Sequence, residues 1–284
     1  MKTSKTYKKS RRRPGPRKRP GSRKRPGPRK RPGSRKRPGS RKVSNKNLNK
    51  SYEEAGWNPI NVSLIKAVES KNYEEVRSLF NNKTLNVNYL WTEPIADSFG
   101  DPTYYTPLLL AVEKSHIEIA KLLLTHTSID VNLANNAGVT PLCVAVGNDD
   151  YEMVELLLRQ EQINVNQQTT ILGYAPIHLA SSNNQPEIVR LLMTHNNINV
   201  NIQNFDGNTA LHLASEKDCI GVVKELTKAP NIQLSIKNND NNTAADVANE
   251  HENFGCASPE ECLNMFLEFK HTSRDIVHHG PRPA

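Results

Sequence analysis

The stretch APIHLASSNNQPEIVRLLMTHNNINVN, residues 175–201, decides the fold because the chain contains the same pattern several times. Three stretches align with it without a gap: TPLLLAVEKSHIEIAKLLLTHTSIDVN from Thr106, TPLCVAVGNDDYEMVELLLRQEQINVN from Thr140 and TALHLASEKDCIGVVKELTKAPNIQLS from Thr209. A weaker copy begins at Val62 and a truncated copy at Thr243. From Thr106 onward the copies start 34, 35, 34 and 34 residues apart, a period that indicates a stacked repeat architecture.

Each copy is predicted to form a helix, a tight turn and a second helix. In the copy from Thr106, the threonine hydroxyl can cap the first helix, and Pro107 suits the first helical position, where no amide hydrogen is needed. Apolar residues then recur at helical spacing: Leu108, Ala111 and Val112, followed by Ile119, Leu122 and Leu123. Neither helix is long enough to be stable alone, so the units must stack. We therefore predict an all-α solenoid of about five to six helix-turn-helix repeats.

The phrases TPLLLAV, APIHLAS and DGNTALHLAS, followed by EIVRLLM and INVN, resemble the ankyrin repeat over roughly residues 57–255. No copy carries the complete Thr-Pro-Leu-His motif of the family, but its histidine is present as His178 and His212. The resemblance implies structural hydrogen bonds from these two rings inside their repeats. It also implies turn glycines, which are Gly138, Gly173 and Gly207, with Asn241 able to adopt a positive φ in the last copy.

The resemblance further implies a protein-binding face, because stacked ankyrin units generally hold other proteins on a concave surface of turn tips and first helices. Carried over position by position, polar candidates on the tips include Asp206, Asn239 and Asp240. Four candidates are apolar or aromatic where solvent alone would favour polar residues: Ile171, Leu172, Tyr174 and Phe205. Two interpretations stay open, namely an exposed strip that binds a partner protein and packing against the neighbouring turn.

An insertion separates the first two copies. Seventeen residues, YLWTEPIADSFGDPTYY, lie between Asn88 and Thr106, where later copies have seven or eight. This 89–105 loop is rich in aromatic residues, which are enriched as anchors at protein interfaces. They are Tyr89, Trp91, Phe99, Tyr104 and Tyr105. They are predicted either to contact the partner protein or to fold back and seal the first repeat.

The first 42 residues differ from the rest in charge. They hold 21 of the 38 Lys and Arg and no Asp or Glu, which leaves 17 cations against all 29 acids and a formal charge of −12 in residues 43–284. Residues 17–40 repeat the hexad RKRPG[S/P] four times. Proline and glycine in each hexad oppose a helix, and the hexads lack the apolar residues of a core. We therefore predict a disordered basic N-terminal arm over residues 1–50.

The arm is predicted to bind polyanions through its hexad cations, with non-specific nucleic acid or an anionic surface as the partner. Nuclear import and masking of the acidic remainder of the chain are the alternatives. The hexad cations are Arg17, Lys18, Arg19, Arg23, Lys24, Arg25, Arg29, Lys30, Arg31, Arg35, Lys36 and Arg37.

The end of the array is predicted to be closed by a helix. Ser258 and Glu261 form a plausible capping box, so we expect the repeats over residues 51–257, a capping helix over 258–271 and a flexible tail over 272–284. No run approaches the roughly 18 apolar residues of a membrane span. The four cysteines, Cys143, Cys219, Cys256 and Cys262, show no CxxC spacing. They are predicted to be free thiols in a reducing intracellular compartment, cytoplasmic or nuclear.

No signature of catalysis is found. The chain contains no phosphate-binding glycine loop, no His-Glu-x-x-His and no Gly-x-Ser-x-Gly, so no catalytic residue, cofactor or metal site is predicted. We expect a non-enzymatic scaffold whose array binds an unidentified protein through its concave face and the 89–105 loop while the arm localises it. The alternative is a nucleic-acid- or chromatin-associated protein bound mainly through the arm.

Overall fold

The structure, a computed structural model, describes residues 58–96, 102–251, 253–255 and 258–275. The predicted basic arm lies outside these residues, together with all of its hexad cations and with Phe99 of the 89–105 loop.

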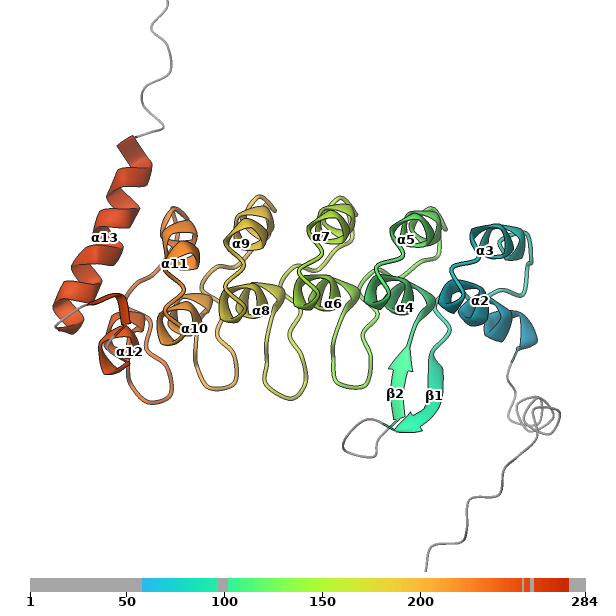
Figure 1. The fold of residues 1–284 in the computed structure, drawn as a ribbon, viewed down its shortest axis with the longest axis horizontal. Helices are drawn as coiled ribbons and strands as arrows, with labels where there is room; N and C mark the ends of the chain where they lie inside the picture. Colours follow the sequence, from blue (N-terminus) through green and yellow to red (C-terminus); the bar gives the residue numbers. More distant parts are fainter. Residues whose placement is uncertain (1–57, 97–101, 252, 256–257, 276–284) are drawn as a thin grey trace, which may run out of the picture. The chain divides into compact units, whose positions relative to one another are not determined.

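The helices fall into two rows (Figure 1). The first helices of the repeats lie side by side: α2 (Pro59–Glu69), α4 (Pro107–Glu113), α6 (Pro141–Gly147), α8 (Pro176–Ser182), α10 (Ala210–Glu216) and α12 (Ala244–Glu250). The second helices form the other row: α3 (Tyr73–Leu79), α5 (Ile117–Leu124), α7 (Tyr151–Leu158), α9 (Pro186–Met193) and α11 (Ile220–Thr227). Each helix contacts the equivalent helices of adjacent repeats, and each second helix also contacts its own first helix. The predicted helical solenoid is thereby confirmed.

The first helices begin where the sequence predicts, and three of the four that start with a proline are capped by the polar side chain before it, α8 being the exception. The Thr106 hydroxyl accepts the amide hydrogen of Leu109 at 3.0 Å, and that of Thr140 accepts the amide hydrogen of Cys143 at 3.2 Å. Asn58 does the same for α2, since its Oδ1 accepts from Ile60 at 3.0 Å. Each cap satisfies an amide that would otherwise lack a partner at the helix start.

The core lies between the two rows. Leu108, Ala111, Ile119 and Leu123 are fully buried, whereas Leu122 is half-buried at the edge of its helix. Complete burial of a leucine or isoleucine side chain contributes roughly 1.5–3 kcal/mol to the free energy of unfolding. Small Ala111 lets the adjacent first helices approach each other closely. Since each helix is only two to three turns long, this burial between repeats is what stabilises it.

The turn from first to second helix uses a left-handed residue that is not glycine. In the second repeat Ser115 has φ 51°, and its neighbour His116 donates its amide hydrogen back to Ala111 at 2.8 Å. This is the hydrogen bond of a Schellman motif, which usually has glycine at the left-handed position. The equivalent residues of the other repeats are Lys71, Asp149, Asn184 and Asp218, with φ of 55° to 56°.

The outer loops, which follow the second helices, are joined by a series of asparagines. The Asn166 side chain donates from Nδ2 to the carbonyl of Asn197 at 2.7 Å and accepts at Oδ1 the amide hydrogen of Asn199 at 2.9 Å. A side chain amide thus pairs with the backbone of the next repeat as a β-strand would. Three further residues make the same two bonds at 2.7–2.9 Å, and we call all four the asparagine ladder: Asn88, Asn132, Asn166 and Asn201.

The 89–105 loop contains the one pair of strands in the described residues. Strands β1 (Trp91–Ala96) and β2 (Pro102–Tyr105) are antiparallel, with Trp91 opposite Tyr105 and Thr92 opposite Tyr104. This hairpin was not predicted, because the segment has neither a two-residue turn signal nor a clear alternation of apolar and polar residues. It extends from the same side of the array as the turns between later repeats (Figure 1).

Helix α13 (Pro259–Asp275) packs against α11 and α12 and covers the last repeat. The Ser258 hydroxyl accepts the amide hydrogen of Glu261 at 3.2 Å, which is one of the two bonds of the expected capping box. Phe266 is fully buried, and Lys270 donates to the carbonyl of Ile232 at 3.0 Å. The helix runs to Asp275, past the end expected at residue 271. None of the helices that the structure describes has the length and apolar character needed to span a membrane.

The prediction of four free thiols is wrong for Cys262, which is buried on α13 and disulfide-bonded. Cys143 and Cys219 are free, as predicted, and both are buried. Cys256 lies outside the described residues. Spacing along the sequence does not report which sulfur atoms the fold brings within bonding distance.

We predict that Ser115→Gly stabilises the protein. A left-handed non-glycine residue costs roughly 1–2 kcal/mol, and glycine removes this strain while adding some entropy to the unfolded chain, so a net gain of roughly 0.5–1 kcal/mol is expected. Urea unfolding at neutral pH measures it. Asn184→Gly is the matched control and should gain less, because asparagine tolerates this conformation. A loss of stability in Ser115→Gly would contradict the assigned strain.

Candidate functional site

The tips of the turns between repeats form a row beneath the first helices (Figure 1). They comprise residues 135–139, 169–174, 204–208 and 238–242. Each tip is bonded to the next by one backbone hydrogen bond: Thr170 N–H to Ala137 at 3.0 Å, Phe205 N–H to Leu172 at 3.1 Å, and Asn239 N–H to Asp206 at 3.0 Å. Neighbouring tips therefore hold fixed positions relative to one another.

Each tip is also braced internally. Asn204 Oδ1 accepts the amide hydrogens of Asp206 at 3.1 Å and Asn208 at 2.8 Å, and Asn135 and Asn238 do the same in their tips. The turn is completed by a residue at positive φ. As predicted, these residues are Gly138, Gly173, Gly207 and Asn241, with φ of 72°, 68°, 75° and 65°.

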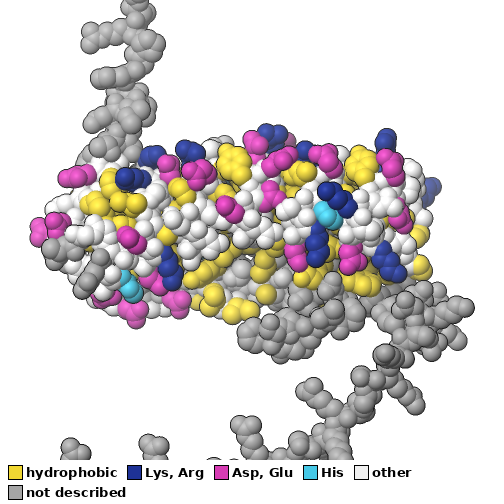
Figure 2. All heavy atoms as spheres, viewed as in Figure 1, with side chains coloured by type: hydrophobic (Ala, Val, Ile, Leu, Met, Phe, Trp, Pro, Cys, Tyr) yellow, Lys and Arg dark blue, Asp and Glu magenta, His cyan; other side chains and the backbone are white. Residues whose placement is uncertain are grey.

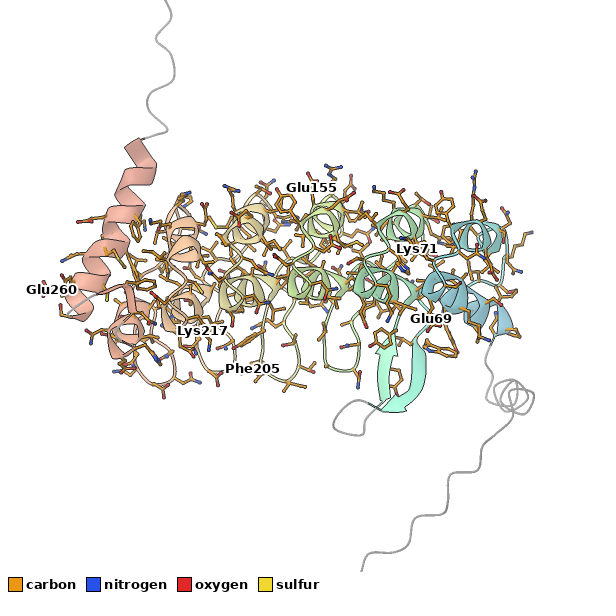
Figure 3. All side chains as sticks on the ribbon, viewed as in Figure 1. Glu69, Lys71, Glu155, Phe205, Lys217 and Glu260 are labelled. Atoms are coloured by element: carbon orange, nitrogen blue, oxygen red, sulfur yellow. The ribbon has the colours of Figure 1, made fainter. Side chains whose placement is uncertain are left out.

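The side chain of Phe205 packs against the preceding tip although much of it is exposed. A Cβ atom at Gly173 would lie only 2.5 Å from the Phe205 ring, so the ring rests directly on the glycine of the preceding tip. The ring is nevertheless 59% exposed, and it points outward from its turn (Figure 3). The sequence shows a glycine in one tip and an aromatic residue in the next, but only the stacking of the tips shows that the two are in contact.

The neighbouring tip exposes two further apolar side chains. Ile171 is 72% exposed and Leu172 is 51% exposed, whereas Tyr174 is half-buried beside His178 with ring centroids 5.8 Å apart. We call the surface formed by Ile171, Leu172, Tyr174 and Phe205 the tip strip. Hydrophobic side chains gather along this lower edge of the array (Figure 2). Of the two interpretations of the sequence, exposure holds for Ile171, Leu172 and Phe205, and partial packing holds for Tyr174.

Carboxylates lie next to the tip strip. Asp206 follows Phe205, and Asp240 occupies the following tip. Burial raises the pKa of Tyr174, and the negative charges of Asp206 and Glu216 raise it further, against the smaller opposite effect of the Lys217 ammonium. Glu216 is paired with Lys217 at 3.3 Å. Within residues 102–251, neither Asp206 nor Asp240 has an ion-pair partner.

The aromatic residues of the 89–105 loop lie apart from the tip strip. Tyr89, Trp91 and Tyr105 are half-buried and pack against the core, and burial raises the pKa of Tyr89. Tyr104 is also half-buried. These residues thus lie against the first repeats, as expected if the loop folds back and seals the first repeat. They do not form one surface with Phe205.

The two signature histidines face the interior. His178 Nδ1 accepts the amide hydrogen of Ala175 at 3.0 Å, and Nε2 lies 3.0 Å from the carbonyl of Ile202, so Nε2 carries the hydrogen. His212 makes the equivalent contacts with Thr209 and Asn242. Burial lowers the pKa of His178 to about 4 and also lowers that of His212. Each neutral ring bonds inside its own repeat, as the resemblance implied, and also bonds the segment that leads into the next repeat.

Two equivalent recesses lie beside the outer loops. One, of about 290 Å³, includes His126 and Arg159, and the other, of about 310 Å³, includes His195 and Lys228. Arg159 is paired with Glu155 at 2.9 Å and Lys228 with Glu225 at 2.7 Å, so the Arg or Lys of each recess is compensated, and the first recess also contains the exposed Glu161. In the part of the chain that the structure describes, no three His, Cys, Asp or Glu side chains are grouped to hold a metal ion.

Comparison with known proteins identifies the family. The sequence model described as "Ankyrin repeats (3 copies)" matches residues 64–169 and 163–238, more than half of the chain. The chain therefore belongs to the ankyrin-repeat family. This fold is a non-enzymatic interaction module, and the chain is a protein-interaction scaffold.

One solved structure illustrates the similarity. The crystal structure of the ankyrin repeat domain of Bcl-3, described as a unique member of the IkappaB protein family, is 26% identical in sequence. The match covers 77% of this chain and 91% of that chain with a TM-score of 0.60. No curated protein sequence matches this chain.

We predict that His178 makes stability fall in mild acid. Because its pKa is about 4 when folded and 6.5 in the reference state, the unfolded chain binds more protons between these values. Stability is therefore fully present above about pH 6.5 and is lost as pH falls toward 4, by up to about 1.4 kcal/mol per pH unit for one proton. His178→Gln should flatten this dependence in urea unfolding across the same pH range.

His251→Gln, which removes an exposed ring at the end of α12, is the control and should keep the wild-type slope. An unchanged slope in His178→Gln would show that its ring does not stay neutral in the folded protein.

Proposed function

We propose that this scaffold binds a partner protein through the tip strip while its basic arm tethers it to a polyanion. The observation that carries the first part is the exposure of Ile171, Leu172 and Phe205 on adjacent, hydrogen-bonded tips. Large exposed apolar groups rimmed by polar residues mark interaction surfaces. An aromatic ring already packed against the preceding tip is a good anchor, since little conformational entropy is lost when it is buried by a partner.

The second part rests on the sequence of the arm. Its 21 cations with no carboxylate favour phosphate-rich or otherwise anionic partners, because binding releases counterions from the polyanion. Residues 1–42 contain a single aromatic residue, Tyr7, so the arm offers charge and not base stacking. Tethering would raise the local concentration of the scaffold near whatever the polyanion surrounds.

Photo-crosslinking tests the role of the tip strip. Benzoylphenylalanine replaces Phe205 in the full chain, and the protein is irradiated in the cells that produce it. We expect discrete protein adducts that disappear when Ile171 and Leu172 are both changed to serine. The matched control places the crosslinker at Tyr151, which is 47% exposed at the start of α7. Identical adducts from both positions, or none from Phe205, would refute binding at the tips.

The alternative function, association with nucleic acid mainly through the arm, is favoured by the same concentration of cations. The two proposed functions are distinguished by measuring how the full chain and residues 43–284 bind a random-sequence duplex across a salt series. If the arm is the binding element, only the full chain binds, and log K falls against log salt with a slope of about 0.9 per neutralised phosphate. Equal binding by both proteins would remove the arm from this role.

A further inference from the structure

The tip strip has a direction along the array. Its apolar side chains, Ile171, Leu172 and Phe205, belong to the fourth and fifth repeats, and the two carboxylates, Asp206 and Asp240, belong to the fifth and sixth. Because each tip is bonded to the next, the order along the row is apolar, then apolar with acidic, then acidic. A partner that lies along this row therefore meets apolar contacts at one end and negative charge at the other.

The charge of the row has a single sign. Residues 135–139, 169–174, 204–208 and 238–242 contain two carboxylates and no Lys or Arg. Lys217 pairs with Glu216 at 3.3 Å, whereas Lys237, which precedes the last tip, donates from its Nζ to Asn241 Oδ1 within that tip at 3.2 Å. Neither Asp206 nor Asp240 forms an ion pair within residues 102–251, so both can accept charge-assisted hydrogen bonds from a partner, which are about twice as strong as neutral ones.

The distance between adjacent tips sets how far apart the contacting residues of a partner must be. Packed helices lie roughly 8–10 Å apart, so adjacent tips are about that distance from each other. A chain in the polyproline II conformation advances about 3.1 Å per residue and completes a turn every three residues, so about three residues cover one repeat and residues three apart face the same side. A segment that follows the row would carry one apolar residue over Ile171 and Leu172, another over Phe205 about three residues on, and a cation over Asp240 about three residues further.

We propose that the tip strip binds an extended segment of another protein with two apolar residues and a following Lys or Arg at this spacing. This inference rests on the function proposed above, and it adds the chemistry and geometry of the partner. A basic residue meets two carboxylates without ion-pair partners there, whereas an acidic residue meets their repulsion, with only the Lys237 ammonium beside the last tip to offset it. Complementary charge of this kind selects among partners that share the same apolar residues.

Selection from a displayed library of random 12-residue peptides tests the proposal. The bait is the full chain, and the library is first depleted on the full-length variant Ile171→Ser/Leu172→Ser/Phe205→Ser. Both proteins carry the arm, so peptides that bind the arm are removed. We expect enriched peptides with two apolar residues about three positions apart and a Lys or Arg about three positions beyond. Enriched peptides without such a cation, or with the helical spacing of about seven, would overturn the proposal.

A charge reversal tests the contact directly. A synthetic enriched peptide should bind the full-length variant Asp206→Lys/Asp240→Lys about tenfold more weakly than wild type, corresponding to about 1.4 kcal/mol. The same peptide with its cation changed to Glu should bind this variant better than it binds wild type. The matched control is Glu161→Lys/Glu187→Lys, which reverses two exposed carboxylates away from the tips and should change the affinity little.

The outcomes distinguish the two proposals. If no peptide depends on Ile171, Leu172 and Phe205, the tip strip does not bind proteins, and both proposals fail. If peptides depend on these residues but bind the charge-reversed variant equally well, binding at the tips stands and the basic partner is wrong.

Discussion

The alignment of neighbouring repeats depends on directional hydrogen bonds, and the asparagine ladder supplies the most regular series of them. Burial holds the repeats together, but apolar contacts are non-directional and allow neighbouring repeats to slide. Each ladder asparagine pairs with a carbonyl and an amide hydrogen of the next repeat at 2.7–2.9 Å, and these two bonds fix one register. The series stops after Asn201, because Ser235 occupies the equivalent position of the next copy. Beyond it, Lys270 of α13 bonds the carbonyl of Ile232 in the same outer loop.

A fixed register between neighbouring repeats places the separate tips on one continuous surface. The tips are joined by single backbone hydrogen bonds, and the Phe205 ring rests on Gly173 of the tip before it. A small slip between the fourth and fifth repeats would separate Phe205 from Ile171 and Leu172 and would move Asp206 relative to Asp240. Recognition at the tips therefore depends on bonds made just before each tip begins, since Asn166 and Asn201 stand three residues ahead of the tips at 169–174 and 204–208.

Much of the fold could be predicted from the sequence, because the same residue pattern recurs in several copies. Thr106, Pro107 and the apolar spacing at Leu108 and Ala111 predict a capped helix in several copies, and tight turns require Gly138 and its equivalents. The hairpin at 89–105 was missed because it occurs once, and the disulfide of Cys262 because cysteine spacing does not encode distance. For the tip strip, the sequence named Ile171 and Phe205 as candidates. Their exposure followed only from how adjacent tips stack, as did the half-burial of Trp91 and Tyr105.

Amide hydrogen exchange in Asn166→Ala tests most directly whether the ladder holds the tips in register. In the wild-type protein the amide of Asn199, which donates to Asn166, should be protected, as should that of Phe205. The variant should expose the first and speed exchange at the second by about tenfold, since each lost hydrogen bond is worth about 1 kcal/mol. Asn183→Ala, at the end of α8, is the control. If Asn199 loses protection while Phe205 exchanges as in wild type, the tips do not depend on the ladder.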